Sequence, residues 1–252
     1  MHNNTLNIGD EVTHVLWTDA TAGWVKSVSK SGKTVTVEFA EQTLLNGTNS
    51  GVYDAAMLNT ITTSGNSAST RGTTKFGNRA LFFDGTGDYL TLTNNSDNYN
   101  FGTGNFTFEM WVYPTTTTKA MTIVDTRSGS GSTTGLIPFE MSATGNVIVS
   151  IGGSQLFTSS SALTGNTWTH LAVVRSGTNV TLYINGTKPT TGNGTSAAIV
   201  SDNFLTVGTS SGSKDTTATN HFQGYIDDLR ITKGYARYVA NFTVPSITFP
   251  GL

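Results

Sequence analysis

The sequence predicts an all-β protein, with a small β-barrel followed by a larger antiparallel β-sandwich. Threonine, which is β-branched and favours strands, makes up about one in six of the 252 residues. Short runs of alternating apolar and polar residues recur along the chain, and turns rich in glycine separate them. No segment sustains the spacing of an amphipathic helix.

Composition and charge exclude several classes of function. The net charge of −2, from 14 basic and 16 acidic residues, provides no positive field for phosphates, so we expect no nucleic-acid partner. The absence of cysteine excludes disulfides, thiolate catalysis and thiolate-bound zinc. We expect no signal peptide and no membrane partner, because the start is polar and no long apolar run follows. The expected location is the cytoplasm or an assembled virus particle.

Residues 1–62 form the predicted small barrel. Alternation over 23–28 and 34–39, with a glycine-containing turn between them, predicts two of its strands. The pattern G-D-x-V, G-x-V-x-x-V and G-x-x-V-x-V-x-F resembles SH3-like barrels of the KOW and Tudor kind, which implies a docking module. Some of those relatives bind RNA or methylated lysine. The rings available for an aromatic cage are also candidates for core packing, which we favour: Trp17, Trp24, Phe39 and Tyr53.

The small polar residues 63–75 predict a linker, and 76–252 form the predicted sandwich. Within 106–113 the alternation predicts one apolar face toward the core, made of Phe106, Phe108, Met110 and Val112. Residues 168–175 become apolar on both faces, which predicts a central strand. Asn185-Gly186 predicts a tight turn after the next strand.

Six motifs occur in the order typical of one family. They are Lys75-Phe76-Gly77, residues 81–90 (LFFDGTGDYL), 106–114 (FTFEMWVYP), 168–175 (WTHLAVVR), 182–186 (LYING) and 224–231 (GYIDDLRI). Together they resemble the laminin-G-like group of concanavalin A-like lectin/glucanase jelly rolls. The segments 232–238 (TKGYARY) and 241–245 (NFTVP) resemble the versions found in tailed-phage virion proteins.

Two acidic motifs are candidate calcium sites, because many relatives of this kind carry calcium. Asp84 and Asp88 lie on one glycine-rich loop, whose carboxylate and backbone oxygens could surround a hard cation. Asp227 and Asp228 interrupt the alternation of their strand. If Leu229 points into the core, a regular strand buries Asp227 as well, and its carboxylate then needs a metal, an arginine or backbone N–H groups at a β-bulge.

The lectin relatives also imply a sugar site. Trp111 and Tyr113, predicted to face outward, are candidates for its aromatic platform, and Asn185 and Asn193 for its polar contacts. Glucanases of this fold use the cluster Glu-x-Asp-x-Glu on one strand, whereas residues 109–112 read Glu-Met-Trp-Val. Because glycoside hydrolysis needs two carboxylates at a set separation, we predict a protein that is not an enzyme.

The resemblance therefore implies a phage virion structural protein, either a capsid decoration or a tail-fibre-associated protein. Its barrel is expected to contact capsid or tail proteins, as a homo-oligomer or in a lattice. Its jelly roll is expected to bind host-surface polysaccharide or to stabilise the particle. The alternatives are a carbohydrate-binding module of a bacterial polysaccharide-degrading enzyme and a free-standing glycosidase.

Overall fold

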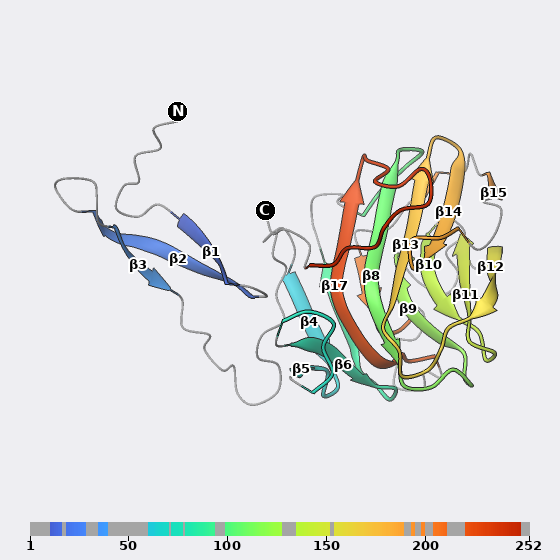
Figure 1. Ribbon diagram of the computed structural model, residues 1–252, viewed down its shortest axis with the longest axis horizontal. Helices are drawn as coiled ribbons and strands as arrows, with labels where there is room; N and C mark the ends of the chain where they lie inside the picture. The colour runs from blue at the N-terminus through green and yellow to red at the C-terminus, as the bar shows by residue number, and fades with distance from the viewer. Residues whose placement is uncertain are drawn as a thin grey trace.

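The computed structural model of the chain is built from β-strands (Figure 1). It describes residues 60–70, 72–77, 79–93, 99–127, 135–151, 154–188, 198–199, 204–210 and 220–247, and the strands at 11–16, 19–28, 35–39 and 193–194. Every regular element in these residues is a strand, so the predicted all-β class is confirmed. No helix long and apolar enough to cross a membrane occurs in this part of the chain.

The N-terminal strands form an antiparallel meander in the order β1-β2-β3. They are β1 (Glu11–Leu16), β2 (Asp19–Val28) and β3 (Val35–Phe39). The alternating runs at 23–28 and 34–39 therefore lie in strands, as predicted. The closure of a barrel over residues 1–62, and the side chains of Trp17, Trp24, Phe39 and Tyr53, lie outside the described residues.

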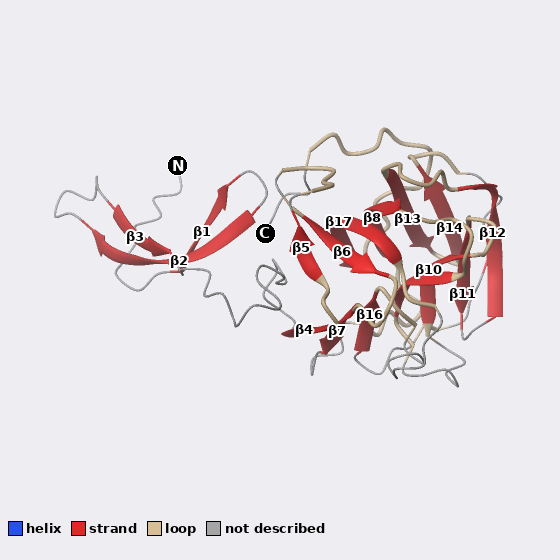
Figure 2. Ribbon diagram, turned by 90° about the horizontal axis from the view of Figure 1, so that it is seen from below, coloured by secondary structure: helices blue, strands red, loops and turns tan. Residues whose placement is uncertain are grey.

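The other strands form two seven-stranded antiparallel sheets in two layers (Figure 2). The back sheet has the order β12-β11-β10-β9-β16-β7-β4, and the front sheet has the order β15-β14-β13-β8-β17-β6-β5. The back strands are β4 (Thr60–Ser64), β7 (Tyr89–Thr93), β9 (Met121–Asp125), β10 (Leu136–Met141), β11 (Asn146–Ile151), β12 (Ser154–Ala162) and β16 (Phe204–Val207). The front strands are β5 (Ala68–Thr70), β6 (Ala80–Asp84), β8 (Phe106–Pro114), β13 (Thr169–Ser176), β14 (Asn179–Ile184), β15 (Asn193–Gly194) and β17 (Gln223–Lys233).

Strand β8 shows how the alternating pattern makes the core. Phe106, Phe108, Met110 and Val112 have no exposed surface and belong to the main apolar cluster between the sheets. Their period of two puts every apolar side chain on one face of the strand, which is the predicted arrangement. β13 lies between β8 and β14, so the predicted central strand is also confirmed.

The sandwich starts at Thr60 rather than at the expected residue 76, and residues 63–75 are not a linker. β4 pairs with β7 along its whole length, and β5 pairs with β6. Ser67, in the turn between them, has no exposed surface. The composition misled because β4 and β5 are edge strands, which tolerate small polar residues that also suit a linker.

The C-terminal segment, residues 234–247, crosses the outer face of the front sheet, and we call it the strap (Figure 1). Thr107 Oγ1 donates to the carbonyl of Tyr235, and Phe242 N donates to the carbonyl of Gly186. Beneath the strap, Ala172, Val174 and Tyr183 form a second small apolar cluster. The strap therefore adds a third layer over part of the front sheet.

We predict that residues 60–75 stabilise the sandwich. A chain lacking residues 1–75 should melt several degrees below one lacking residues 1–59, because it loses the pairing of β4 and β5 and exposes the edges of β7 and β6. Circular dichroism on both shortened chains gives the comparison. Equal melting temperatures would place the boundary at residue 76 after all.

Candidate functional site

A β-bulge in β17 decides which side chains reach the outer face of the front sheet. The pairing of β17 with β8 shifts between Asp227 and Arg230, and Asp228 has a positive φ of 54°. Because the bulge adds a residue, Leu229 packs against the core while Asp227 and Arg230 both pair across to outward positions of β8. Of the partners expected for Asp227, the structure has backbone N–H groups, those of Lys75 and Phe76.

Glu109 is the centre of a charged network on this face. Its side chain is fully buried, and its Oε1 lies 2.7 Å from Nη2 of Arg230, which the bulge directs toward it. The hydroxyl of Tyr238 in the strap donates to Oε2 at 2.7 Å, and His170 Nε2 lies 3.7 Å from the same oxygen. Burial alone would raise the pKa of Glu109, but the contacts with His170, Tyr238 and Arg230 lower it below the usual value.

Trp111 does not present its ring to solvent, which corrects its expected role as a sugar platform. Only 4% of the residue is exposed. The Nζ of Lys75 lies 3.8 Å from the centroid of the indole, and the rings of Phe76 and His170 meet it edge-on. The loop that Asp227 holds by its N–H groups therefore covers Trp111.

A row of four half-buried aromatic rings crosses the same face, one position along the strands from Trp111. Phe82 comes from β6, Tyr225 from β17, Tyr113 from β8, and Trp168 directly precedes β13. Neighbouring ring centroids are 5.0, 5.7 and 5.4 Å apart. The register Phe82↔Tyr225↔Tyr113 puts these rings side by side, so the row follows from strand pairing. We call these four residues the aromatic row.

Polar residues border the aromatic row on the side away from Trp111. Asp84 and Gln223, which pair with each other, lie two residues beyond Phe82 and Tyr225. Thr115 follows β8, and its N and Oγ1 both donate to the carbonyl of Gln223. Asn166 precedes Trp168, and its N donates to the carbonyl of Pro114. An apolar strip beside carboxylate, amide and hydroxyl groups matches the chemistry of a sugar, which has C–H faces and hydroxyl edges.

The four acidic residues expected to bind calcium do not converge on one site. Asp88 accepts the N–H groups of Asn66 and Asp84 on its two oxygens, and Asp84 accepts the N–H of Thr86. Among the described residues, no three carboxylate or imidazole side chains are placed to hold one metal ion. Backbone N–H groups already bond to Asp84, Asp88 and Asp227, so these carboxylates have partners without a metal ion.

Of the two expected asparagines, Asn185 is exposed in a tight turn. It has a φ of 48° and Gly186 one of 75°, the positive pair that the Asn-Gly prediction requires. Its Oδ1 accepts the N–H of His170, so its side chain fastens the turn to β13. The side chain of Asn193 lies outside the described residues.

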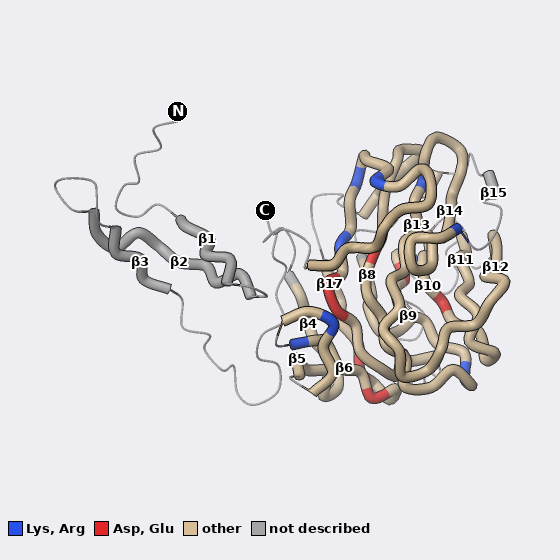
Figure 3. The backbone as a smooth tube through the Cα atoms, in the orientation of Figure 1, with Lys and Arg blue, Asp and Glu red and all other residues tan. Residues whose placement is uncertain are grey.

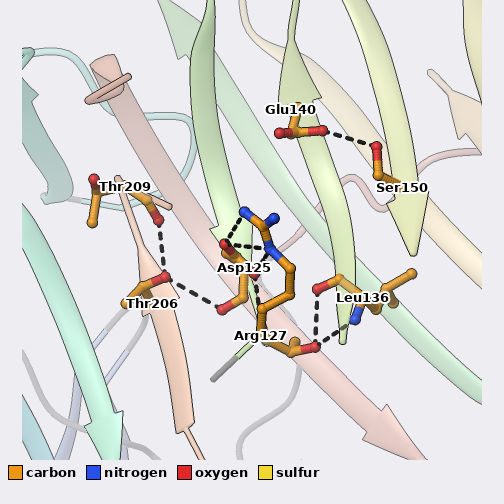
Figure 4. Close-up of polar contacts among 8 residues, drawn as sticks. Asp125, Arg127, Leu136, Glu140, Ser150, Thr206 and Thr209 are labelled. Atoms are coloured by element: carbon orange, nitrogen blue, oxygen red, sulfur yellow. Dashed lines mark hydrogen bonds and ion pairs between the residues drawn. The ribbon is translucent and has the colours of Figure 1, made fainter. Parts of the chain in front are cut away.

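The back sheet carries a buried charge pair of its own (Figure 4). Arg127 donates from Nε and Nη2 to the carboxylate of Asp125, which has no exposed surface. Nearby, Ser150 donates to Glu140, and burial raises the pKa of that carboxyl. These contacts satisfy groups that are costly to bury alone, which is a structural role.

Sequence reasoning placed Tyr113 in the site but did not include Phe82, Tyr225 and Trp168. Phe82, Tyr225 and Tyr113 pair at one position of the pleat, and Trp168 directly precedes β13, the next strand. The alternation of β8 predicted an outward direction for Tyr113, but the strand order and register that bring the other rings beside it are tertiary features. Figure 3 shows long stretches of both sheets without charged residues, so charge gave no signal either.

Comparison with known proteins gives a family match. A laminin G type model, described as the concanavalin A-like lectin/glucanases superfamily, matches residues 84–237. A search of curated proteins found no match.

Solved structures share the fold at low sequence identity. Domain 4 of AbnA, a GH43 extracellular arabinanase from Geobacillus stearothermophilus in complex with arabinotriose, has a TM-score of 0.54 and 21% identity, and the match covers 71% of this chain and 83% of that chain. The binding domain of botulinum neurotoxin serotype D has a TM-score of 0.53 and 16% identity, and the match covers 71% of this chain and 44% of that chain. The binding domain of botulinum neurotoxin serotype G has a TM-score of 0.52 and 15% identity, and the match covers 71% of this chain and 44% of that chain. The match thus spans less than half of either toxin chain.

We predict that Tyr238→Phe loosens the strap and destabilises the fold by about 1.5–3 kcal/mol, because it removes a hydrogen bond to a buried charge. Chemical denaturation measures the loss. Tyr235→Phe is the matched control, since Tyr235 is 62% exposed. Equal losses in both variants would contradict the role of the Glu109 contact.

Glu109 should also make the stability of the fold depend on pH in the acidic range. Its lowered pKa means that it stabilises the fold while ionised, above about pH 4.3, and that this contribution is lost as the pH falls through the lowered pKa. Glu109→Gln should therefore be less stable at neutral pH and lose less stability on acidification. Melting curves from pH 7 downward test this, and parallel acid profiles would contradict it.

For the loop at residues 84–88, we predict that Asp88→Asn costs about 1–3 kcal/mol, because an amide NH₂ would face a buried backbone N–H. Asp84→Asn should be nearly neutral, since its carbonyl can still accept the N–H of Thr86. A chelator such as EDTA should leave the melting temperature unchanged. A melting temperature that rises with added calcium and falls with EDTA would instead support the metal that the family resemblance implies.

Proposed function

The chain belongs to the concanavalin A-like lectin/glucanases superfamily, and we propose that its sandwich is a non-catalytic glycan-binding module of a tailed-phage virion protein. The observation that carries the glycan-binding part is the aromatic row. Four rings from neighbouring strands lie side by side on a sheet face, half-exposed, with polar side chains along one border. Such a surface can cover the C–H faces of sugar rings and meet their hydroxyl groups.

The state of Glu109, the acid at the centre of the charged network on this face, supports a binding role over hydrolysis. A glycosidase needs an accessible general acid with a raised pKa and a second carboxylate across the bond. Glu109 is fully buried, is paired with Arg230 and has a lowered pKa. Glu109 binds the strap through the hydroxyl of Tyr238, and the aromatic row lies further along β8.

The virion setting rests on the resemblance of residues 232–238 and 241–245 to phage virion proteins. These residues end β17 and form most of the strap, so the resemblance covers a structural element that clasps the sandwich. In this proposal, the region before the sandwich, residues 1–59, attaches the chain to capsid or tail proteins as a homo-oligomer or lattice. Repeated copies would strengthen weak sugar binding at single sites through avidity. The same anchoring would serve particle stabilisation.

One observation favours a second candidate, a carbohydrate-binding module of a polysaccharide-degrading enzyme. The arabinanase domain, which was solved with arabinotriose, is matched over 83% of its own chain. This candidate shares the aromatic row and differs in what the N-terminal region attaches to.

We predict that the full chain binds immobilised host-surface polysaccharide and that Tyr113→Ala or Trp168→Ala weakens binding about ten-fold or more, since an uncovered ring is worth about 1.5–3 kcal/mol. Surface plasmon resonance measures the affinity, and melting curves confirm folding. Tyr235→Ala is the control, an exposed ring on the strap. Binding that is absent, or unchanged in both row variants, would overturn the glycan role.

The virion role is tested separately by immunogold labelling of purified phage particles with an antibody to this chain. Regular labelling of the capsid or tail supports it. Unlabelled particles, with the chain found in a secreted polysaccharide-degrading complex, would favour the second candidate.

A further inference from the structure

We infer that the aromatic row binds a single, twisted chain of neutral sugars that runs across the strands, one sugar unit to a ring. The inference rests on the glycan-binding function proposed above and specifies its ligand. It follows from the spacing of the rings, their relative tilt, the charges beside them and the residues that cover the neighbouring side chains Trp111 and His170.

The spacing of the rings sets the direction of the ligand. Neighbouring strands in a sheet lie about 4.7–4.9 Å apart, so side chains at one pleat position repeat at about that distance across the sheet. The ring centroids are 5.0, 5.7 and 5.4 Å apart, close to the length of one pyranose unit in an extended polysaccharide. A chain lying perpendicular to the strands therefore meets a new ring with each unit.

The tilt of the rings selects a twisted chain over a flat surface. Phe82 and Tyr225 are inclined at 42°, Tyr225 and Tyr113 at 81°, and Tyr113 and Trp168 at 56°. Four rings inclined in this way cannot lie against one plane, which excludes the face of a crystalline polysaccharide. They suit a single chain whose successive units rotate.

The polar border selects neutral sugars. Beside the row lie Gln223, Thr115 and Asn166, whose amide and hydroxyl groups can bond to sugar hydroxyls. The charges near this border are of both signs, since Asp84 lies beyond Phe82, and Lys119 Nζ donates to the carbonyl of the adjacent Gly85. Such a balance gives no net attraction for an acidic or a basic polymer.

The other border limits the site to the width of one chain. Trp111 and His170 occupy the next position of the pleat, and Lys75 and the Phe76 ring cover Trp111, while Phe242 of the strap meets His170. A second parallel chain would have to displace both covers. Of these two neighbouring positions of the pleat, only the aromatic row is therefore open to a ligand.

The experiment measures affinity against ligand length by isothermal titration calorimetry on the full chain. The probes are size-fractionated oligosaccharides of one to six units from amylose, linear mannan and linear 1,5-arabinan, with crystalline cellulose and polygalacturonate for comparison. For the series that binds, the affinity should rise with each unit up to four and then level off. It should not change between low and high ionic strength, and the two comparison polymers should not bind.

Substitutions of single rings test whether the aromatic row is the surface that binds the sugar chain. Trp168→Ala removes an end ring, so the affinity should level off one unit earlier. Tyr113→Ala should weaken binding of three or more units by about ten-fold, because any three adjacent rings include Tyr113. Tyr113→Phe, which keeps the ring, should restore the length profile, and Tyr235→Ala should leave it unchanged.

Three outcomes would overturn the inference while leaving the proposed function standing. They are equal affinity for one unit and for six, binding to crystalline cellulose, and binding to polygalacturonate that salt abolishes. If no oligosaccharide binds and the immobilised polysaccharides fail as well, the proposed function is lost together with the inference.

Discussion

The fully buried carboxylate of Glu109 is the constraint on which the outer face of the front sheet depends. A charge removed from water must be paired, and leaving it unpaired costs about 3–5 kcal/mol. Two partners come from residues far along the chain, Arg230 at the bulge of β17 and Tyr238 in the strap. Because Glu109 stands in the middle strand of its sheet, satisfying it fixes both the shape of β17 and the path of the strap.

That arrangement divides the front sheet into a covered part and an open part. The strap lies over Ala172, Val174 and Tyr183, and the loop bearing Lys75 lies over Trp111. The aromatic row remains uncovered beyond both. A lectin-like fold does not specify a function, and members of one fold differ in the sites that they carry. Here the site is whatever the strap and the loop leave open, so elements outside the two sheets define it.

The two acidic motifs that suggested a metal also join separate backbone segments. Asp88 is fully buried and Asp227 half-buried, and each accepts two backbone N–H groups. A carboxylate in such a position joins segments that strand pairing does not reach, the turn after β4 in one case and the loop after β5 in the other. The sequence could show that Asp227 needed a partner, but the identity of its backbone donors leaves no mark in the sequence.

The sequence by itself determined the all-β class, the inward face of β8, the Asn185-Gly186 turn and the need of Asp227 for a partner. These are local, because alternation, turn chemistry and the cost of burying a charge act within a few residues. Only the tertiary structure decided that β4 and β5 belong to the sandwich, that Trp111 is buried, and that Phe82, Tyr225, Tyr113 and Trp168 form one row. Those outcomes depend on strand order and register, which leave no periodic signal within any single strand and which, in the aromatic row, join residues more than a hundred positions apart.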